Sequence, residues 1–140
     1  MKKLKIEANL KKLDELIDYI KAGLAPYSIS PALFNDVELA VEEVFNNIAS
    51  YAYAPSNGTV DIYLSVDENK ILIKFEDTGK PFNPLEQAGP DLHVPLMERE
   101  IGGLGIYFVK QIMDDITYSY IENKNVLTLT LKLRVEKGKC

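Results

Sequence analysis

The sequence predicts an α+β fold, a two-layer sandwich with helices on one face of a mainly antiparallel sheet. Two helical patterns come first, and a third lies between two pairs of strand-like runs. Each pair of runs is separated by a short polar turn, which is typical of antiparallel hairpins. Because 140 residues that are 46% hydrophobic fit one ordinary core, we expect a single domain over residues 1–140.

The N-terminal part predicts a short strand and two helices. "KKLKIEA" alternates like an edge strand, and "NLKKLDELIDYIKAG" follows with Asn9 as its cap and Gly23 as its stop. "SPALFNDVELAVEEVFNNIASYAYAP" is the longest helical pattern, beginning at Ser-Pro and ending at Pro55. The apolar positions of the first helix are Leu10, Leu13, Ile17 and Ile20.

The remaining elements are two hairpins with a helix between them. "TVDIYLSV" and "ILIKFED" flank the turn "DENK", and "ITYSYI" and "VLTLTLKLRV" flank "ENKN". "LGIYFVKQIMDD" lies between the hairpins and predicts a helix. On the last strand four leucines alternate and are most simply core, an interface being the alternative: Leu127, Leu129, Leu131 and Leu133.

Composition excludes several classes of function. The net charge is −5 and the basic residues are scattered, which argues against a nucleic-acid surface. Cys140 is the only cysteine, so an internal disulfide is impossible and a reducing compartment is indicated. No apolar run is long enough for a membrane span, and the N-terminus lacks a secretory apolar core. We therefore expect a cytoplasmic protein without membrane association.

The long helix carries two pairs of a carboxylate and an amide four residues apart. At 100° per residue, Glu43 and Asn47 border the apolar face, whereas Glu42 and Asn46 point toward water. The simplest interpretation of Glu43 and Asn47 is a local side-chain hydrogen bond on the helix flank. The alternative is a functional pair at the edge of the core.

Two glycine segments favour the functional interpretation. In "EDTGKPF" a strand ends at Asp77, and Gly79 permits either a positive φ or the close approach of a ligand. In "IGGLGIYFVKQIMD", Gly102, Gly103 and Gly105 occupy the start of a helix, where unpaired backbone amides can hold phosphate. Neither a P-loop nor a dinucleotide-binding GxGxxG after a strand is present.

In this order the motifs resemble a known superfamily. "ExxxN" inside "LAVEEVFNNIASYAY", then "DTGKPF", then "GGLGIYFVKQIMD" is similar to the ATP-binding fold of gyrase, heat-shock chaperones, histidine kinases and mismatch-repair proteins (GHKL). Within it, the chain most resembles the stand-alone anti-sigma-factor serine kinases. The similarity is clearest over residues 39–115. The resemblance implies the histidine-kinase-like ATPase fold, with ATP and Mg²⁺ as cofactors.

The resemblance also implies roles for individual residues. Glu43 would be the general base, and Asn47 would bind Mg²⁺ at the phosphates. Asp77 would bind the adenine amino group, and Gly79 would let the base approach. The backbone amides of the helix start would bind the phosphates: Gly102, Gly103, Leu104 and Gly105. Residues 84–101 would form the nucleotide lid.

The sequence departs from the family pattern at two places. Tyr51 stands where the family often has a histidine, and the only histidine, His93, falls in the expected lid. The last hairpin lacks a clear Gly-Thr signature, so its nucleotide contact could be Asn125, Thr128 or neither.

The chain shows no dimerisation helix with an acceptor histidine and no second, closing domain. The resemblance therefore implies a free-standing serine/threonine kinase, a STAS-type anti-sigma-factor antagonist as its substrate, a sigma factor as its alternative partner, and a homodimer. A second hypothesis is an ATP-binding module that holds a partner protein without phosphoryl transfer. A third is a structural domain with coincidental glycines.

Overall fold

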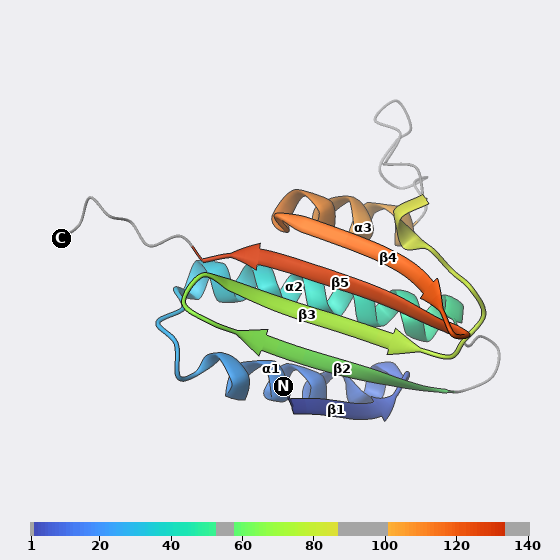
Figure 1. Ribbon diagram of the computed structural model, residues 1–140, viewed down its shortest axis with the longest axis horizontal. Helices are drawn as coiled ribbons and strands as arrows, with labels where there is room; N and C mark the ends of the chain where they lie inside the picture. The colour runs from blue at the N-terminus through green and yellow to red at the C-terminus, as the bar shows by residue number, and fades with distance from the viewer. Residues whose placement is uncertain (1, 53–57, 87–100, 134–140) are drawn as a thin grey trace.

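A five-stranded antiparallel sheet forms one layer of the protein in a computed structural model that describes residues 2–52, 58–86 and 101–133 (Figure 1). The strands are β1 (Lys2–Glu7), β2 (Thr59–Val66), β3 (Lys70–Asp77), β4 (Asp115–Ile121) and β5 (Lys124–Lys132). Their spatial order is β1-β2-β3-β5-β4, and every neighbouring pair is antiparallel. β3 and β5 therefore lie side by side at the centre, and β1 is an edge strand as predicted.

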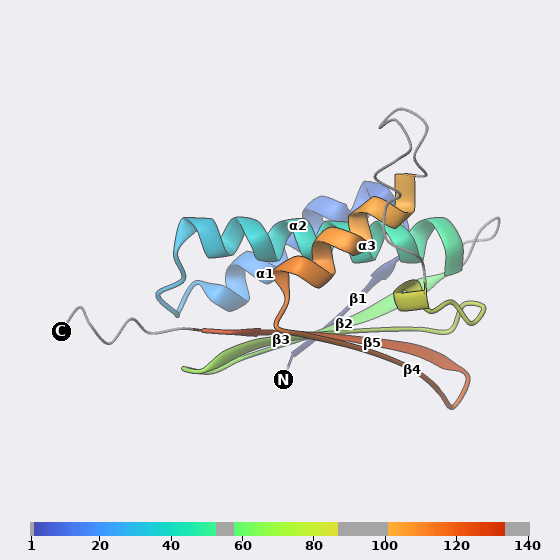
Figure 2. The same ribbon diagram turned by 90° about the horizontal axis from the view of Figure 1, so that it is seen from above.

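Three helices cover one face of this sheet, and no helix of the described residues lies on the other, open face (Figure 2). They are α1 (Leu13–Leu24), α2 (Pro31–Asn47) and α3 (Ile101–Ile112). A 3₁₀ turn precedes α1 at Leu10–Lys12, and a π-helical turn follows α2 at Ile48–Ala52. The predicted α+β two-layer sandwich is confirmed. Among the described residues, no helix is both long enough and apolar enough to cross a membrane.

The first helical segment confirms one predicted end and corrects the other. The Asn9 side chain accepts a hydrogen bond from the Lys11 backbone N–H at 3.0 Å, so Asn9 is the cap. Gly23 does not stop the helix, which continues to Leu24. A Cβ atom at position 23 would lie 2.2 Å from Leu64 Cδ2, so this glycine lets α1 approach β2 closely. Leu10 is also not core, because it is 52% exposed.

The two hairpins follow the predicted pattern, with one correction to a turn. β2 has the predicted bounds, and β3 begins one residue earlier than expected. The second turn contains two residues, Glu122 and Asn123, instead of four. Both have positive φ, 53° and 65°, as a tight type I′ hairpin turn requires. Asn125 consequently lies inside β5, where it pairs with Asp77 of β3.

The core lies between the inner face of the sheet and the helices. Alternate residues of β2, β3 and β5 point into it, which confirms that Leu127, Leu129 and Leu131 are core. Leu133 packs against the same cluster and is partly buried. The buried side chains of α2 complete the inner layer: Val37, Ala40, Val41, Val44 and Phe45.

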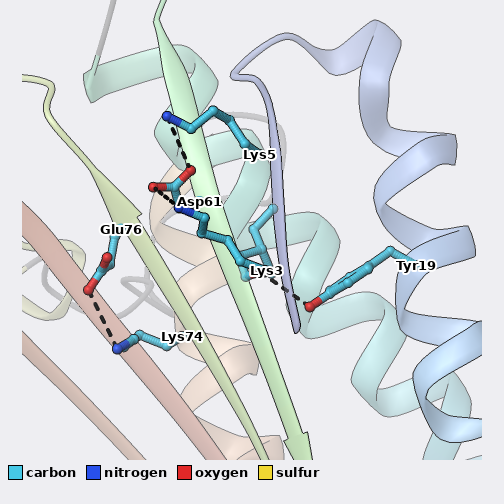
Figure 3. Close-up of polar contacts among 7 residues, drawn as sticks. Lys3, Lys5, Tyr19, Asp61, Lys74 and Glu76 are labelled. Carbon is cyan, nitrogen blue, oxygen red and sulfur yellow. Dashed lines mark hydrogen bonds and ion pairs between the residues drawn. The ribbon is translucent and has the colours of Figure 1, made fainter. Parts of the chain in front are cut away.

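Charged side chains occupy the open face of the sheet (Figure 3). Asp61 of β2 lies between Lys3 and Lys5 of the edge strand, 3.8 Å from each ammonium nitrogen. Lys74 forms an ion pair with Glu76 at 3.5 Å. The lysine side chains of these pairs are 32% to 60% exposed, whereas the side chains of Asp61 and Glu76 are only 18% and 16% exposed.

Candidate functional site

The C-terminal ends of α2 and β3 lie near the start of β5 (Figure 1), and residues of these elements line a pocket. The empty space among its lining residues is about 360 Å³ when the part open to solvent is included, and only about 20 Å³ of it can hold the centre of a water-sized sphere. Most of its wall is apolar, and its polar side chains are few and specific, which is typical of ligand sites. The residues that line it are Val44, Asn47, Ile48, Phe75, Asp77, Phe82, Pro84, Tyr118, Asn125 and Leu127.

Asp77 is the acidic group of the pocket. It is the last residue of β3 and only 5% exposed. Its Oδ1 accepts hydrogen bonds from the Gly79 backbone N–H and from Asn125 Nδ2, both at 2.9 Å. Burial raises the pKa of this carboxyl, although both hydrogen bonds act in the opposite direction. The site therefore holds a desolvated carboxylate whose orientation is set by two donors.

Asn125 connects the pocket to the loop after β3. Its side chain is 5% exposed. Its Nδ2 donates to the Lys80 carbonyl at 2.9 Å and to the Gly79 carbonyl at 3.4 Å, besides the bond to Asp77. Its Oδ1 accepts from the Phe82 backbone N–H at 3.1 Å and from the Tyr118 hydroxyl. One amide thus joins β3, the following loop, β4 and β5.

Asn47 supplies an unpaired amide to the same pocket. It is the last residue of α2 and 3% exposed. Its Nδ2 has no hydrogen-bond partner within the described residues, which contradicts the interpretation of Glu43 and Asn47 as a local hydrogen-bonded pair. A buried polar atom without a partner is costly and requires an explanation. The π-helical turn that begins at Ile48 adds a second irregularity here, and such turns are frequent at functional sites.

The two glutamates of α2 lie next to the pocket without lining it. Glu43 is half-buried, one helical turn before Asn47, and is absent from the described residues of the pocket wall. Glu42, which is predicted to point to water, is also half-buried. Burial raises the pKa of Glu42, and the nearby carboxylates of Glu38 and Glu43 raise it further. The structure therefore separates the two glutamates less sharply than helical phase predicted.

The glycine-rich segment forms the start of α3. This helix begins at Ile101, three residues earlier than predicted, so Gly102, Gly103, Leu104 and Gly105 belong to its first turns. Their backbone amides occupy the end of a helix that favours anions. No glycine of the described residues has a positive φ, so only the close-approach role remains for Gly79, which is buried.

The expected lid, residues 84–101, is described only at its ends. Pro84–Glu86 form a 3₁₀ turn, and Pro84 is buried in the pocket wall. Residues 87–100, which include His93, lie outside the described residues, as does the side chain of Tyr51.

The structure places the two candidate nucleotide contacts of the last strand on opposite faces of the sheet. Asn125 lines the pocket, whereas Thr128 pairs with Lys74 and lies on the open face of the sheet. Sequence reasoning missed Tyr118 and Phe82. Tyr118 pairs with the core residue Leu127, so its place facing the helices could have been found from the hairpin register.

This arrangement of layers and pocket defines a histidine-kinase-like ATP-binding domain. The chain belongs to the histidine kinase-like ATPase domain family, whose pattern matches residues 6–131. ATP is the ligand that a domain of this family implies. The resemblance noted for the motifs is thereby confirmed.

The chain is also similar to two serine-protein kinases. Over 96 residues the chain is 32% identical to serine-protein kinase RsbW of Bacillus thuringiensis, a match that covers 66% of this chain and 60% of that protein. It is 28% identical to serine-protein kinase RsbW of Staphylococcus aureus over an alignment of 144 positions, which covers 94% of this chain and 89% of the relative. The Bacillus match thus spans less than two thirds of that relative's length.

Solved structures share the fold at low sequence identity. The RsbU and RsbW domains of a Mycobacterium tuberculosis protein match with a TM-score of 0.60 and 16% identity, covering 96% of this chain and 34% of that one. The histidine kinase domain of a blue-light-activated kinase from Erythrobacter litoralis matches with a TM-score of 0.55 and 15% identity, covering 88% and 60%. These similarities support the fold alone.

Proposed function

We propose that this protein is an ATP-dependent serine/threonine kinase that acts as an anti-sigma factor. Its substrate is a STAS-type anti-sigma-factor antagonist, and its other partner is a sigma factor. The observation that carries the proposal is the pocket itself. The desolvated carboxylate of Asp77 and the buried amide of Asn47, whose Nδ2 has no partner in the described part of the chain, share one cavity in a histidine-kinase-like ATPase domain.

The residues of the pocket fit a nucleotide. Asp77 holds the amino group of the base, and the buried Gly79 lets the base approach the backbone. The unpaired amide of Asn47 supports a ligand at the end of α2, because it has no partner within the described residues. The amides at the start of α3, from Gly102 to Gly105, bind the phosphates.

Magnesium is the cation that this chemistry calls for. Among the described residues, no group of three or more His, Cys, Asp or Glu side chains is placed to hold a metal. Mg²⁺ commonly takes few ligands from the protein and the rest from phosphates and water. In the proposal Asn47 provides the protein ligand through its amide oxygen, and the ion neutralises charge on the phosphates.

Phosphoryl transfer then needs positioning and one base. A serine or threonine hydroxyl of the antagonist attacks the γ-phosphorus of ATP. The new O–P bond forms as the bond to ADP breaks, and Glu43 takes the hydroxyl proton. Glu43 is the candidate because it lies one turn before Asn47 on the same helix. A single domain over residues 1–140, a homodimer and a cytoplasmic location belong to the same proposal.

A second candidate function is an ATP-binding module that holds its partner without phosphoryl transfer. One observation favours it, since Glu43 does not line the pocket within the described residues. Both candidates bind ATP, so nucleotide binding alone does not separate them.

The deciding experiment incubates the protein with γ-labelled ATP, Mg²⁺ and a purified STAS-domain protein. If the protein is a kinase, the STAS-domain protein becomes labelled. Glu43→Ala should then slow labelling by roughly 10²- to 10⁴-fold while ATP binding persists. Glu42→Ala is the matched control on the neighbouring position and should have little effect. Asn47→Ala should weaken the Mg²⁺ dependence of ATP binding. Tight ATP binding without transfer to any STAS protein favours the binding module, and inactivation by Glu42→Ala instead would identify Glu42 as the base.

A further inference from the structure

Asn125 is a buried polar side chain with no assigned part in the proposed reaction. An asparagine side chain has two N–H donors and one carbonyl oxygen with two lone pairs. In the structure Nδ2 contacts three acceptors, and Oδ1 accepts from two donors. Every hydrogen-bonding position of the amide is occupied by protein. Asn125 therefore lines the pocket without a free group to offer a ligand.

The hydrogen bond from Asn125 to Asp77 changes what the carboxylate can offer. Both hydrogen bonds that Asp77 accepts from described residues fall on the same oxygen, Oδ1. One comes from the Gly79 backbone and the other from Asn125, each at 2.9 Å. A carboxylate oxygen has two lone pairs, so these two donors saturate Oδ1. Only Oδ2 remains to accept a hydrogen bond from a molecule in the pocket.

A single available oxygen discriminates between purine bases. Guanine presents a ring N–H and an amino group side by side, and these two donors pair best with both oxygens of one carboxylate. Adenine presents one amino group beside a ring nitrogen that only accepts. With Oδ1 occupied, guanine would leave one of its two donors without an acceptor in a desolvated site, whereas the single amino group of adenine still pairs with Oδ2.

We propose that Asn125 is a positioning residue that sets base selectivity by occupying Oδ1 of Asp77. It acts through Asp77 and does not touch the base. The inference rests on the proposed binding of ATP at this pocket and goes beyond it by naming the residue that excludes guanine nucleotides. The register of the sheet makes this possible, because Asn125 of β5 lies directly opposite Asp77 of β3.

The test compares affinities for ATP and GTP by isothermal titration calorimetry in the full chain. The wild-type protein should bind ATP at least about tenfold more tightly than GTP, as one unpaired buried donor predicts. Asn125→Leu is similar in size and cannot donate, so it should reduce the ATP-to-GTP preference by about tenfold. Thr128→Val is the matched control, since Thr128 lies on the same strand and the opposite face of the sheet. This control should keep the wild-type preference.

The ratio of affinities separates the proposal from a purely structural role. If Asn125 only holds the loop in place, Asn125→Leu weakens ATP and GTP equally and the preference stays unchanged, which overturns the inference. If Asn125→Leu does not fold, judged by circular dichroism, Asn125→Ala replaces it, because an alanine side chain has no group that can donate to Asp77. A wild-type protein that binds ATP and GTP equally well also overturns the inference, while leaving nucleotide binding intact. A wild-type protein that binds neither overturns the proposed function itself.

Discussion

Replacing Asp77 with asparagine tests the centre of the site with little disturbance of the fold. An asparagine at this position retains an oxygen that can accept from the Gly79 N–H and from Asn125 Nδ2. It replaces the second carboxylate oxygen with an N–H₂ donor. That donor would meet the amino group of the base, which is itself a donor. We therefore expect Asp77→Asn to fold and to lose nucleotide affinity.

The magnitude follows from the contacts. A hydrogen bond to a charged group contributes about 1.5 to 3 kcal/mol, so ATP affinity should fall by roughly 10- to 100-fold. Asp77→Ala should reduce the stability of the fold more, because it removes Asp77 Oδ1, the acceptor of the hydrogen bond from the buried Gly79 N–H. An unsatisfied buried N–H lowers the free energy of unfolding by about 1 to 3 kcal/mol, or Tm by roughly 4 to 12 °C. Removal of the buried charge of Asp77 offsets part of this loss. Asn125 Nδ2 also loses an acceptor in Asp77→Ala, but it still donates to the Lys80 carbonyl.

The assay combines calorimetric titration with ATP and urea unfolding of the same preparations. Asp77→Asn should unfold near the wild-type midpoint and bind ATP weakly. If Asp77→Asn binds ATP within about twofold of wild type, Asp77 is an ordinary residue at a strand end and the proposed site is wrong. Loss of binding that accompanies loss of folding in both variants would instead place Asp77 in the scaffold.

Three further predictions concern pH and local structure. Burial raises the pKa of Asp77 in the folded protein above its value in the unfolded chain. The contribution of Asp77 to the free energy of unfolding is therefore complete below the unfolded-state pKa and is lost as pH rises through the folded-state pKa. Wild type should therefore lose stability relative to Asp77→Asn as the pH rises above the usual aspartate pKa of about 3.9, measured by urea unfolding, and a relative gain would contradict the raised pKa. Ser30→Ala removes the acceptor of the Leu33 N–H at the start of α2 and should cost about 0.5 to 2 kcal/mol, whereas Ser30→Asp should not. Glu122→Asn should raise Tm because asparagine tolerates the positive φ of this turn better than glutamate, and an unchanged or lower Tm would show that the turn is not strained.

Local chemistry made much of the fold predictable. Asn9 was recognised as a helix cap and Ser30 as the start of the long helix, because both act on backbone groups within three residues. The first hairpin was also located from its alternation and its polar turn. These features depend on neighbours close in sequence, so the pattern of residues is sufficient to predict them.

Predictions from local sequence patterns were less accurate at positions whose structure depends on tertiary packing. Gly23 has the character of a helix stop, yet it lies inside α1, because Leu64 of a distant strand requires the space. Leu10 has the helical spacing of a core residue and lies in solvent, because a 3₁₀ turn precedes α1. Glu42 is half-buried, although helical phase places it on the solvent side of α2.

By itself the sequence determined the order of helices and hairpins, the absence of other nucleotide motifs, and the identity of Asp77 and Asn47 as candidates. Only the tertiary structure decided that these two side chains share a pocket and that Asn47 Nδ2 has no hydrogen-bond partner among the described residues. It also decided that Asn125, 48 positions from Asp77, saturates one oxygen of that carboxylate. The physical reason is register: the pairing of β3 with β5 sets which distant residues meet, and no local pattern contains that information.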